Sequence, residues 1–162
     1  MYALIILVPI SAAQADDAGV SLPQPDGSVL TLPAPAQRIV TLAPNLAELV
    51  FAAGAGNKLQ AVVEYSNFPA EVQQLPRVGD AFRIDLERII EIAPDLVIAW
   101  SSGNPQSALF KLEQLGVKVW QVEITRPEEI AATVKAIAIA AGTETEGLPV
   151  AGRLQSRLAQ LK

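Results

Sequence analysis

Hydrophobic positions along this chain follow two spacings that alternate from about residue 38 onward. Short runs of consecutive apolar residues are typical of parallel strands buried on both faces. Between these runs, apolar residues return every three or four positions, as in amphipathic helices. The runs predict four strands, at residues 39–42, 59–63, 96–99 and 117–122. The helical spacing predicts helices at residues 46–53, 85–92, 106–115 and 127–141, with one or two helical turns at 69–75.

Strands that alternate with helices predict an α/β fold. Right-handed crossovers then give a Rossmann-like lobe over residues 38–143, with a parallel four-stranded sheet flanked by helices. In residues 16–37, the turn signal Pro25-Asp26-Gly27 between two short alternating runs predicts a small β-hairpin and a linker. A last helix is predicted over residues 148–162. Its apolar stripe, which no later element of the chain covers, consists of Leu154, Leu158 and Leu161.

The first ten residues form an apolar run that is too short to span a bilayer. Ala13-Gln14-Ala15 follows and has the small-x-small form of a cleavage site. We therefore interpret residues 1–15 as a secretory signal peptide, with Asp16 as the mature start. No Lys or Arg precedes the run, so a simple apolar N-terminus without an export role is the alternative.

Composition narrows the function classes. The net charge of −5 disfavours a nucleic-acid partner, because binding to phosphates needs a basic surface. The chain has no Cys and no His, which removes thiolate chemistry, the usual triads and the commonest zinc ligand. No metal site is expected. An enzyme would have to use carboxylates or lysine, and the sequence contains neither a dinucleotide fingerprint nor a phosphate loop.

The segments that follow the predicted strands carry most of the aromatic residues. Ligands bind an open parallel sheet at the carboxyl ends of its strands. Tyr65, Phe68 and Trp100 follow strands directly, and Phe82 lies in the loop at 79–84. Aromatic rings among amides and hydroxyls suit a large, partly flat ligand. The alternative is that the rings close the end of a small core, and Phe68, which precedes Pro69, is expected to pack against its turn.

The first turn on this rim is unusually short. Ala43-Pro44-Asn45 alone separates the first strand from its helix, and Asn45 and Glu48 have the spacing of a capping box. A helix start exposes unpaired N–H groups, from which a ligand oxygen could accept hydrogen bonds. Ordinary helix capping explains the same residues without a ligand.

Several segments resemble the N-terminal half of a periplasmic binding protein. The class has two α/β lobes joined by one long helix and serves ABC importers of cobalamin, haem and iron–siderophores. The resemblance rests on Arg-Ile-Val-Thr-Leu-Ala-Pro-Asn-Leu-Ala-Glu at 38–48, Val-Gly at 78–79, Asp-Leu-Glu-Arg-Ile-Ile at 85–90, Ala-Pro-Asp-Leu-Val-Ile at 93–98 and Leu-Gly-Val-Lys-Val at 115–119. Features that favour the cobalamin branch are Tyr65-Ser66, Phe68-Pro69, Ala99-Trp100 and Gly103-Asn104.

The resemblance implies a carrier rather than an enzyme, with cobalamin as transported ligand and no cofactor. Tyr65 and Trp100 would pack on the corrin or its side groups. The implied ligand-binding set is Pro44, Asn45, Tyr65, Phe82, Trp100, Gly103 and Asn104. Glu87 would dock on an ABC permease in the inner membrane, although a solvent-exposed helix face explains Glu87, Arg88 and Glu91 equally well.

The same resemblance implies that residues 144–162 begin the linking helix and that a C-terminal lobe is missing. One lobe would cover about half of a ligand and bind it weakly, as a fragment, a broken gene or half of a split binder. Within the family, a haem or siderophore carrier is the alternative. Arg83 and Arg126 are the only rim arginines that could meet an anionic ligand.

Two further classes remain open at this point. One is a small α/β hydrolase or transferase that uses Glu64 or Glu123 as its base. The other is an interaction module that docks on a permease through Glu87 without binding a ligand.

Overall fold

The computed structural model describes residues 19–161, so the predicted signal peptide lies outside the described residues. The strands are β1 (Val20–Pro23), β2 (Val29–Leu32), β3 (Ile39–Thr41), β4 (Leu59–Ala61), β5 (Leu96–Trp100) and β6 (Val119–Val122). The helices are α1 (Pro44–Ala52), α2 (Leu86–Ile92), α3 (Gln106–Gln114), α4 (Pro127–Ala141) and α5 (Glu144–Ala159), with 3-10 turns η1 (Gly56–Lys58) and η2 (Ala70–Gln74).

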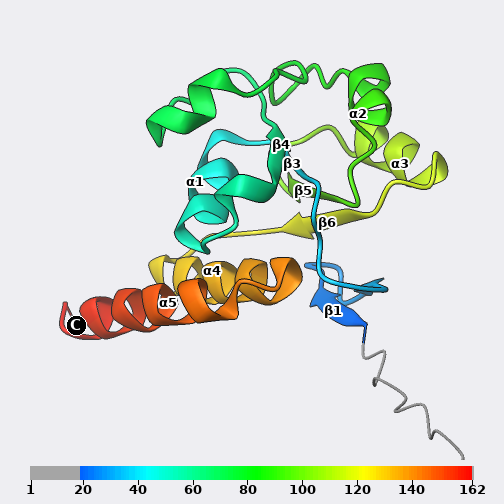
Figure 1. Cartoon of the computed structure of the whole chain (residues 1–162). Helices are drawn as coiled ribbons and strands as arrows, with labels where there is room; N and C mark the ends of the chain where they lie inside the picture. The colour runs from blue at the N-terminus through cyan, green and yellow to red at the C-terminus, as the bar shows by residue number, and fades with distance from the viewer. Residues whose placement is uncertain (1–18, 162) are drawn as a thin grey trace, which may run out of the picture.

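The four central strands form one parallel sheet in the order β4-β3-β5-β6, which confirms the predicted fold class. Successive residues of a strand face opposite sides, so each inner strand contributes to two cores. On one side, Ile39 of β3 packs in a cluster with α1 and α4. On the other, Val40 packs in a cluster with α2 and α3. Burial on both faces explains the continuous apolar runs, and Figure 1 shows the helices around the sheet.

The hairpin of β1 and β2 is attached to the outer strand β6. Leu22 and Leu32 are buried and join the main core, while Gly27 supplies the left-handed turn with φ of +85°. The indole Nε1–H of Trp120 donates to the carbonyl oxygen of Pro23 at 2.9 Å. The side-chain oxygen of Gln24 accepts from the N–H of Gln121 at 3.0 Å. The hairpin therefore covers an edge that would otherwise present an open backbone donor.

Helix α5 runs antiparallel along α4, and its C-terminal end projects past the start of α4 (Figure 1). The two helices approach closely at Gly147, where an added Cβ would lie 2.4 Å from the Cβ of Ala138. Leu154 and Leu158 are half-buried and Leu161 is exposed, so the described residues leave the apolar stripe partly open. Among these residues no helix is both long and apolar enough to cross a membrane.

Some predicted boundaries are wrong. Strand β4 ends at Ala61, and Val62 makes an isolated bridge with Arg77 instead of continuing the strand. Helix α5 starts at Glu144 rather than at 148, because the chain needs only Gly142 and Thr143 to reverse after α4.

The predicted capping box at the start of α1 is absent. The N-cap is Ala43, Pro44 is the first helical residue, and no side chain caps this end. Proline is pre-organised for the first helical position and has no N–H to satisfy, so the helix begins earlier and Asn45 lies inside it.

A side-chain cap does occur at the start of α4. The Oε2 atom of Glu129 accepts from the N–H groups of Thr125 (2.7 Å) and Arg126 (3.1 Å), and its Oε1 accepts from the guanidinium of Arg126 (2.8 Å). The hydrogen bond from the Thr125 N–H, followed by those from Arg126, lowers the pKa of Glu129 from 4.5 to about 2.

This cap makes the lobe sensitive to acid. Because the folded-state pKa of Glu129 is depressed, its stabilisation is present above pH 4.5 and is lost as the pH falls towards about 2. We expect the Glu129→Gln variant to have a lower free energy of unfolding at neutral pH than the wild type. Its free energy of unfolding should also fall less than that of the wild type between pH 4.5 and about 2. Urea unfolding followed by circular dichroism at several pH values measures both effects. Glu113→Gln on the exposed face of α3 controls for lost charge, and identical pH slopes for wild type and Glu129→Gln would contradict the prediction.

Candidate functional site

The segments after the parallel strands meet at one rim, and the buried side chain of Asn104 joins three of them. Its Nδ2 donates to the carbonyl oxygens of Leu42 (2.9 Å), after β3, and Ala81 (3.0 Å), in the 79–84 loop. Its Oδ1 accepts from the N–H of Trp100 (2.7 Å), at the end of β5. Both amide donors are used within the protein and the residue is only 5% exposed. Asn104 thus links these rim segments from their buried side.

Trp100 is fixed at its ring as well as at its backbone. The indole lies against Gly103, where an added Cβ would be 2.7 Å from a ring carbon. The indole Nε1–H donates to Oε1 of Glu123 at 3.2 Å, and the N–H of Ser102 donates to Oε2 at 2.9 Å. The side chain remains 36% exposed, so part of the ring faces solvent at the rim.

The 79–84 loop presents Phe82 on the same rim. Gly79 has φ of +87°, and an added Cβ would lie 2.0 Å from the carbonyl oxygen of Arg83, so no other residue fits there. The Oδ1 atom of Asp80 accepts from the N–H groups of Phe82 and Arg83, each at 2.7 Å. These two bonds, the one from Phe82 first, lower the pKa of Asp80. Phe82 as a residue is 78% exposed.

Tyr65 lies beside this loop, because the N–H of Glu64 donates to the carbonyl oxygen of Gly79 at 2.8 Å. Tyr65 has φ of +66°, an uncommon conformation for an aromatic residue, and its ring is 79% exposed. Such strain is found more often at functional sites than elsewhere. Phe68 is 67% exposed, so the expectation that it packs against its turn is wrong.

The opening turn of α1 completes the rim. Pro44 is half-buried and Asn45 is exposed, with no hydrogen bond from its side chain to the described residues. The structure therefore gathers the predicted aromatic residues and the start of α1 along one edge of the sheet.

The two arginines predicted for the rim differ in whether they form an ion pair. Arg126 forms an ion pair with Glu129 at 2.8 Å, so only Arg83 of the two predicted arginines is left without a carboxylate partner among residues 19–161. Within the same residues there is no cluster of three metal-ligating side chains.

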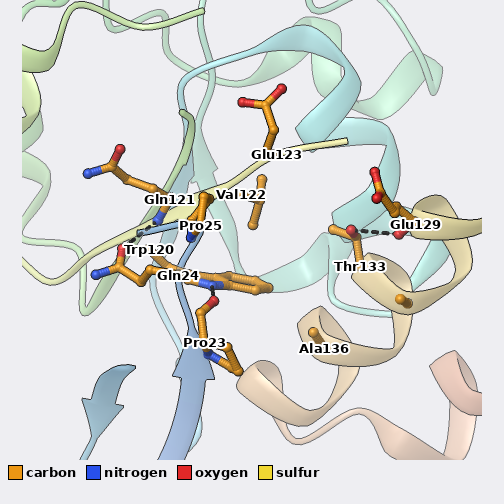
Figure 2. Close-up of a pocket in the computed structure, with 11 residues that line it drawn as sticks. Pro23, Gln24, Pro25, Trp120, Gln121, Val122, Glu123, Glu129, Thr133 and Ala136 are labelled. Carbon is orange, nitrogen blue, oxygen red and sulfur yellow. Dashed lines mark hydrogen bonds between the residues drawn. The ribbon is translucent and has the colours of Figure 1, made fainter. Parts of the chain in front are cut away.

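A groove of about 340 Å³ lies beside the rim, between the hairpin, β6 and α4 (Figure 2). Pro23, Trp120 and Ala136 line it, and its walls are mostly apolar. Glu123 also borders the groove, but in Figure 2 its carboxylate points away from the indole of Trp120. Glu123 thus borders both the groove and the rim.

Sequence reasoning missed how Asn104 and Glu123 act on the rim. Asn104 was expected to bind ligand, and the structure shows its amide occupied by three rim segments. The sequence predicts Glu123 only as a candidate base, and the structure shows it accepting hydrogen bonds from Trp100 and Ser102. The signal for the contact between Glu123 and Trp100 is a carboxylate directly after the strand that neighbours the strand of the rim tryptophan.

The model of one protein family, described as periplasmic binding protein, matches residues 39–162. The chain belongs to the periplasmic binding protein family. This family consists of binding proteins and not of enzymes. Membership therefore excludes the alternative of a small hydrolase or transferase with Glu64 or Glu123 as its base.

Relatives in the periplasmic binding protein family include several named vitamin B12-binding proteins. The chain is 39% identical over 121 residues to that of Vibrio cholerae and 36% identical over 121 residues to that of Photorhabdus laumondii. In both cases the match covers 75% of this chain and 44% of the relative. The chain therefore spans less than half the length of these relatives.

Solved structures of the family agree with this fold. The periplasmic vitamin B12 binding protein BtuF of Vibrio cholerae matches with a TM-score of 0.76 at 39% identity, over 78% of this chain and 50% of that one. A periplasmic heme binding protein from Pseudomonas aeruginosa matches with a TM-score of 0.70 at 27% identity, over 77% of this chain and 45% of that one. The heme binding protein HmuT, at 21% identity and a TM-score of 0.73, shows the shared fold over 99% of this chain and 52% of that one.

Removing the Asn104 amide tests whether it holds the rim. Asn104→Ala leaves two carbonyl oxygens and one N–H without their partner, and we expect the free energy of unfolding to fall by about 2–4 kcal/mol. Chemical denaturation measures the loss. Asn45→Ala is the matched control, because Asn45 is exposed, and it should change stability by less than about 0.5 kcal/mol. Equal stabilities of the two variants would rule out this role of Asn104.

Proposed function

We propose that this protein is the N-terminal ligand-binding lobe of a periplasmic carrier that delivers cobalamin to an ABC importer. The observation that carries the proposal is the convergence of exposed Tyr65, Phe82 and partly exposed Trp100 on one rim of a lobe in this family. Relatives that bear the name vitamin B12-binding protein support the choice of ligand.

The chemistry of the rim suits a corrin. A corrin is a broad ring system with amide side groups, and it needs apolar faces together with a few hydrogen-bonding groups. Tyr65, Phe82 and Trp100 would supply the faces. Pro44 and Asn45 would bring the start of α1 to the ligand, where N–H groups of the first turn can meet an amide oxygen. Gly103 and Asn104 would act on the ligand through the shape of the Trp100 loop.

Haem is the second candidate, because a heme binding protein shares the fold at 27% identity. Tyr65 is the observation that favours it, since its exposed phenol makes no hydrogen bond within residues 19–161 and tyrosine can bind haem iron. Two observations weigh against haem and siderophores: the sequence has no His, and one of the two rim arginines is already paired.

A second lobe would complete the site. We propose that residues 16–37 form the hairpin and linker, 38–143 the lobe and 144–162 the beginning of the helix that connects to a C-terminal lobe. The open stripe with Leu158 and Leu161 supports this, because an apolar helix face gains stability when another layer covers it. The signal peptide at residues 1–15 and export to the periplasm belong to the same proposal.

Replacing Trp100 tests the ligand site. We expect Trp100→Ala to raise the dissociation constant for cyanocobalamin at least roughly tenfold, because an aromatic stacking surface is lost. Titration followed by the visible absorption bands of the corrin measures the affinity. Phe110→Ala is the control, since Phe110 is an exposed aromatic in the middle of α3 and not in a segment at the end of a strand. If the wild-type protein bound haem and not cyanocobalamin, the proposed ligand would be wrong and haem would take its place.

Glu87 lies in the first turn of α2 and is exposed, as a docking contact requires. We propose that it pairs with basic residues of the permease. Glu87→Arg should then weaken association with the permease in nanodiscs, because like charges would meet at the contact. Glu144→Arg places the same charge change in the first turn of α5, on the other side of the sheet, and should have the smaller effect. Equal effects of the two variants would argue for general surface charge and against a specific contact.

A further inference from the structure

We infer that Glu123 is a positioning residue that fixes the indole of Trp100 in its ligand-facing orientation before a ligand arrives. This inference rests on the proposed function only where it concerns affinity. Its structural part concerns the ligand-free protein, and it can be tested without any ligand.

Three donors converge on the Glu123 carboxylate from one short loop. Its Oε1 accepts from the indole Nε1–H of Trp100 (3.2 Å) and from the hydroxyl of Ser102 (2.9 Å). Its Oε2 accepts from the N–H of Ser102 (2.9 Å). Glu123 directly follows β6, the neighbour of β5 in the sheet, so the bonds connect the ends of two adjacent strands.

A glutamate side chain matches this set of donors better than its amide would. A carboxylate accepts at both oxygens, whereas the amide of glutamine would turn two N–H donors towards the loop in place of one acceptor. The residue type is therefore matched to the loop that it holds.

Trp100 is consequently restrained from three directions. Asn104 holds its backbone N–H, Gly103 supports one face of the ring, and Glu123 holds the ring edge. Tyr65 and Phe82 differ, because their rings are 79% and 78% exposed and neither side chain is hydrogen-bonded to the described residues. The rim thus has one fixed aromatic surface and two adaptable ones. A surface that is already ordered costs less conformational entropy when the ligand binds.

The indole N–H resonances of the protein provide the test. The chain has two tryptophans, so a ¹⁵N–¹H spectrum gives two indole signals, and Trp100→Phe assigns them. In the ligand-free protein, we expect Glu123→Ala to move the Trp100 signal upfield and to speed its exchange with water, while the Trp120 signal stays in place. Glu123→Gln should restore part of the shift, because it keeps one oxygen acceptor. Glu64→Gln, an exposed carboxylate after β4, controls for charge on the rim.

Affinity gives the second measurement. Glu123→Ala should raise the dissociation constant for cyanocobalamin by roughly tenfold, with Glu123→Gln in between. An unchanged Trp100 indole signal in Glu123→Ala would overturn the inference, as would a changed signal with unchanged affinity. If the wild-type protein does not bind cyanocobalamin, the proposed ligand is wrong, and haem takes its place in the affinity measurement while the indole test stands by itself. A general loss of folding in Glu123→Ala would move both indole signals and would also count against a positioning role.

Discussion

Burial of β3 and β5 on both faces is the constraint on which this lobe depends. Each strand sends alternate side chains into two separate cores, so neither can slip or reverse without exposing one of them. The fixed parallel register then brings the loops after the strands to one edge. The aromatic rim is a consequence of that register, since Trp100 ends β5 and the start of α1 follows the neighbouring strand β3.

The rim loops are joined by a few buried or partly buried polar groups in addition to apolar packing at their bases. Asn104 joins three loops from within, and Glu123 ties the Trp100 loop to the end of β6. Hydrogen bonds to otherwise unpaired backbone groups further restrict the conformation of these loops. The result is a rigid frame from which Tyr65 and Phe82 extend into solvent.

The sequence predicted the sheet, the order of the helices and the placement of the aromatic residues, because these follow from hydrophobic spacing and the direction of parallel strands. It did not predict which polar side chains point inward. Asn104 and Asn45 are the same residue type and both lie near the rim, yet Asn104, in a loop, is buried, and Asn45, in the first turn of α1, is exposed. Their difference depends on distant carbonyl groups, such as that of Leu42, whose position only the assembled fold determines. The capping box failed for a local reason, because Pro44 starts the helix early.

The hairpin has a consequence for how such a lobe behaves in solution. A strand at the margin of a sheet offers a template on which a second molecule can add its own strand. Here the Gln24 side chain occupies a backbone donor of β6, and the Trp120 indole anchors the covering turn. Self-association through that margin would first have to detach the hairpin and expose Leu22 and Leu32. Strands β1 and β2 therefore disfavour aggregation through this edge.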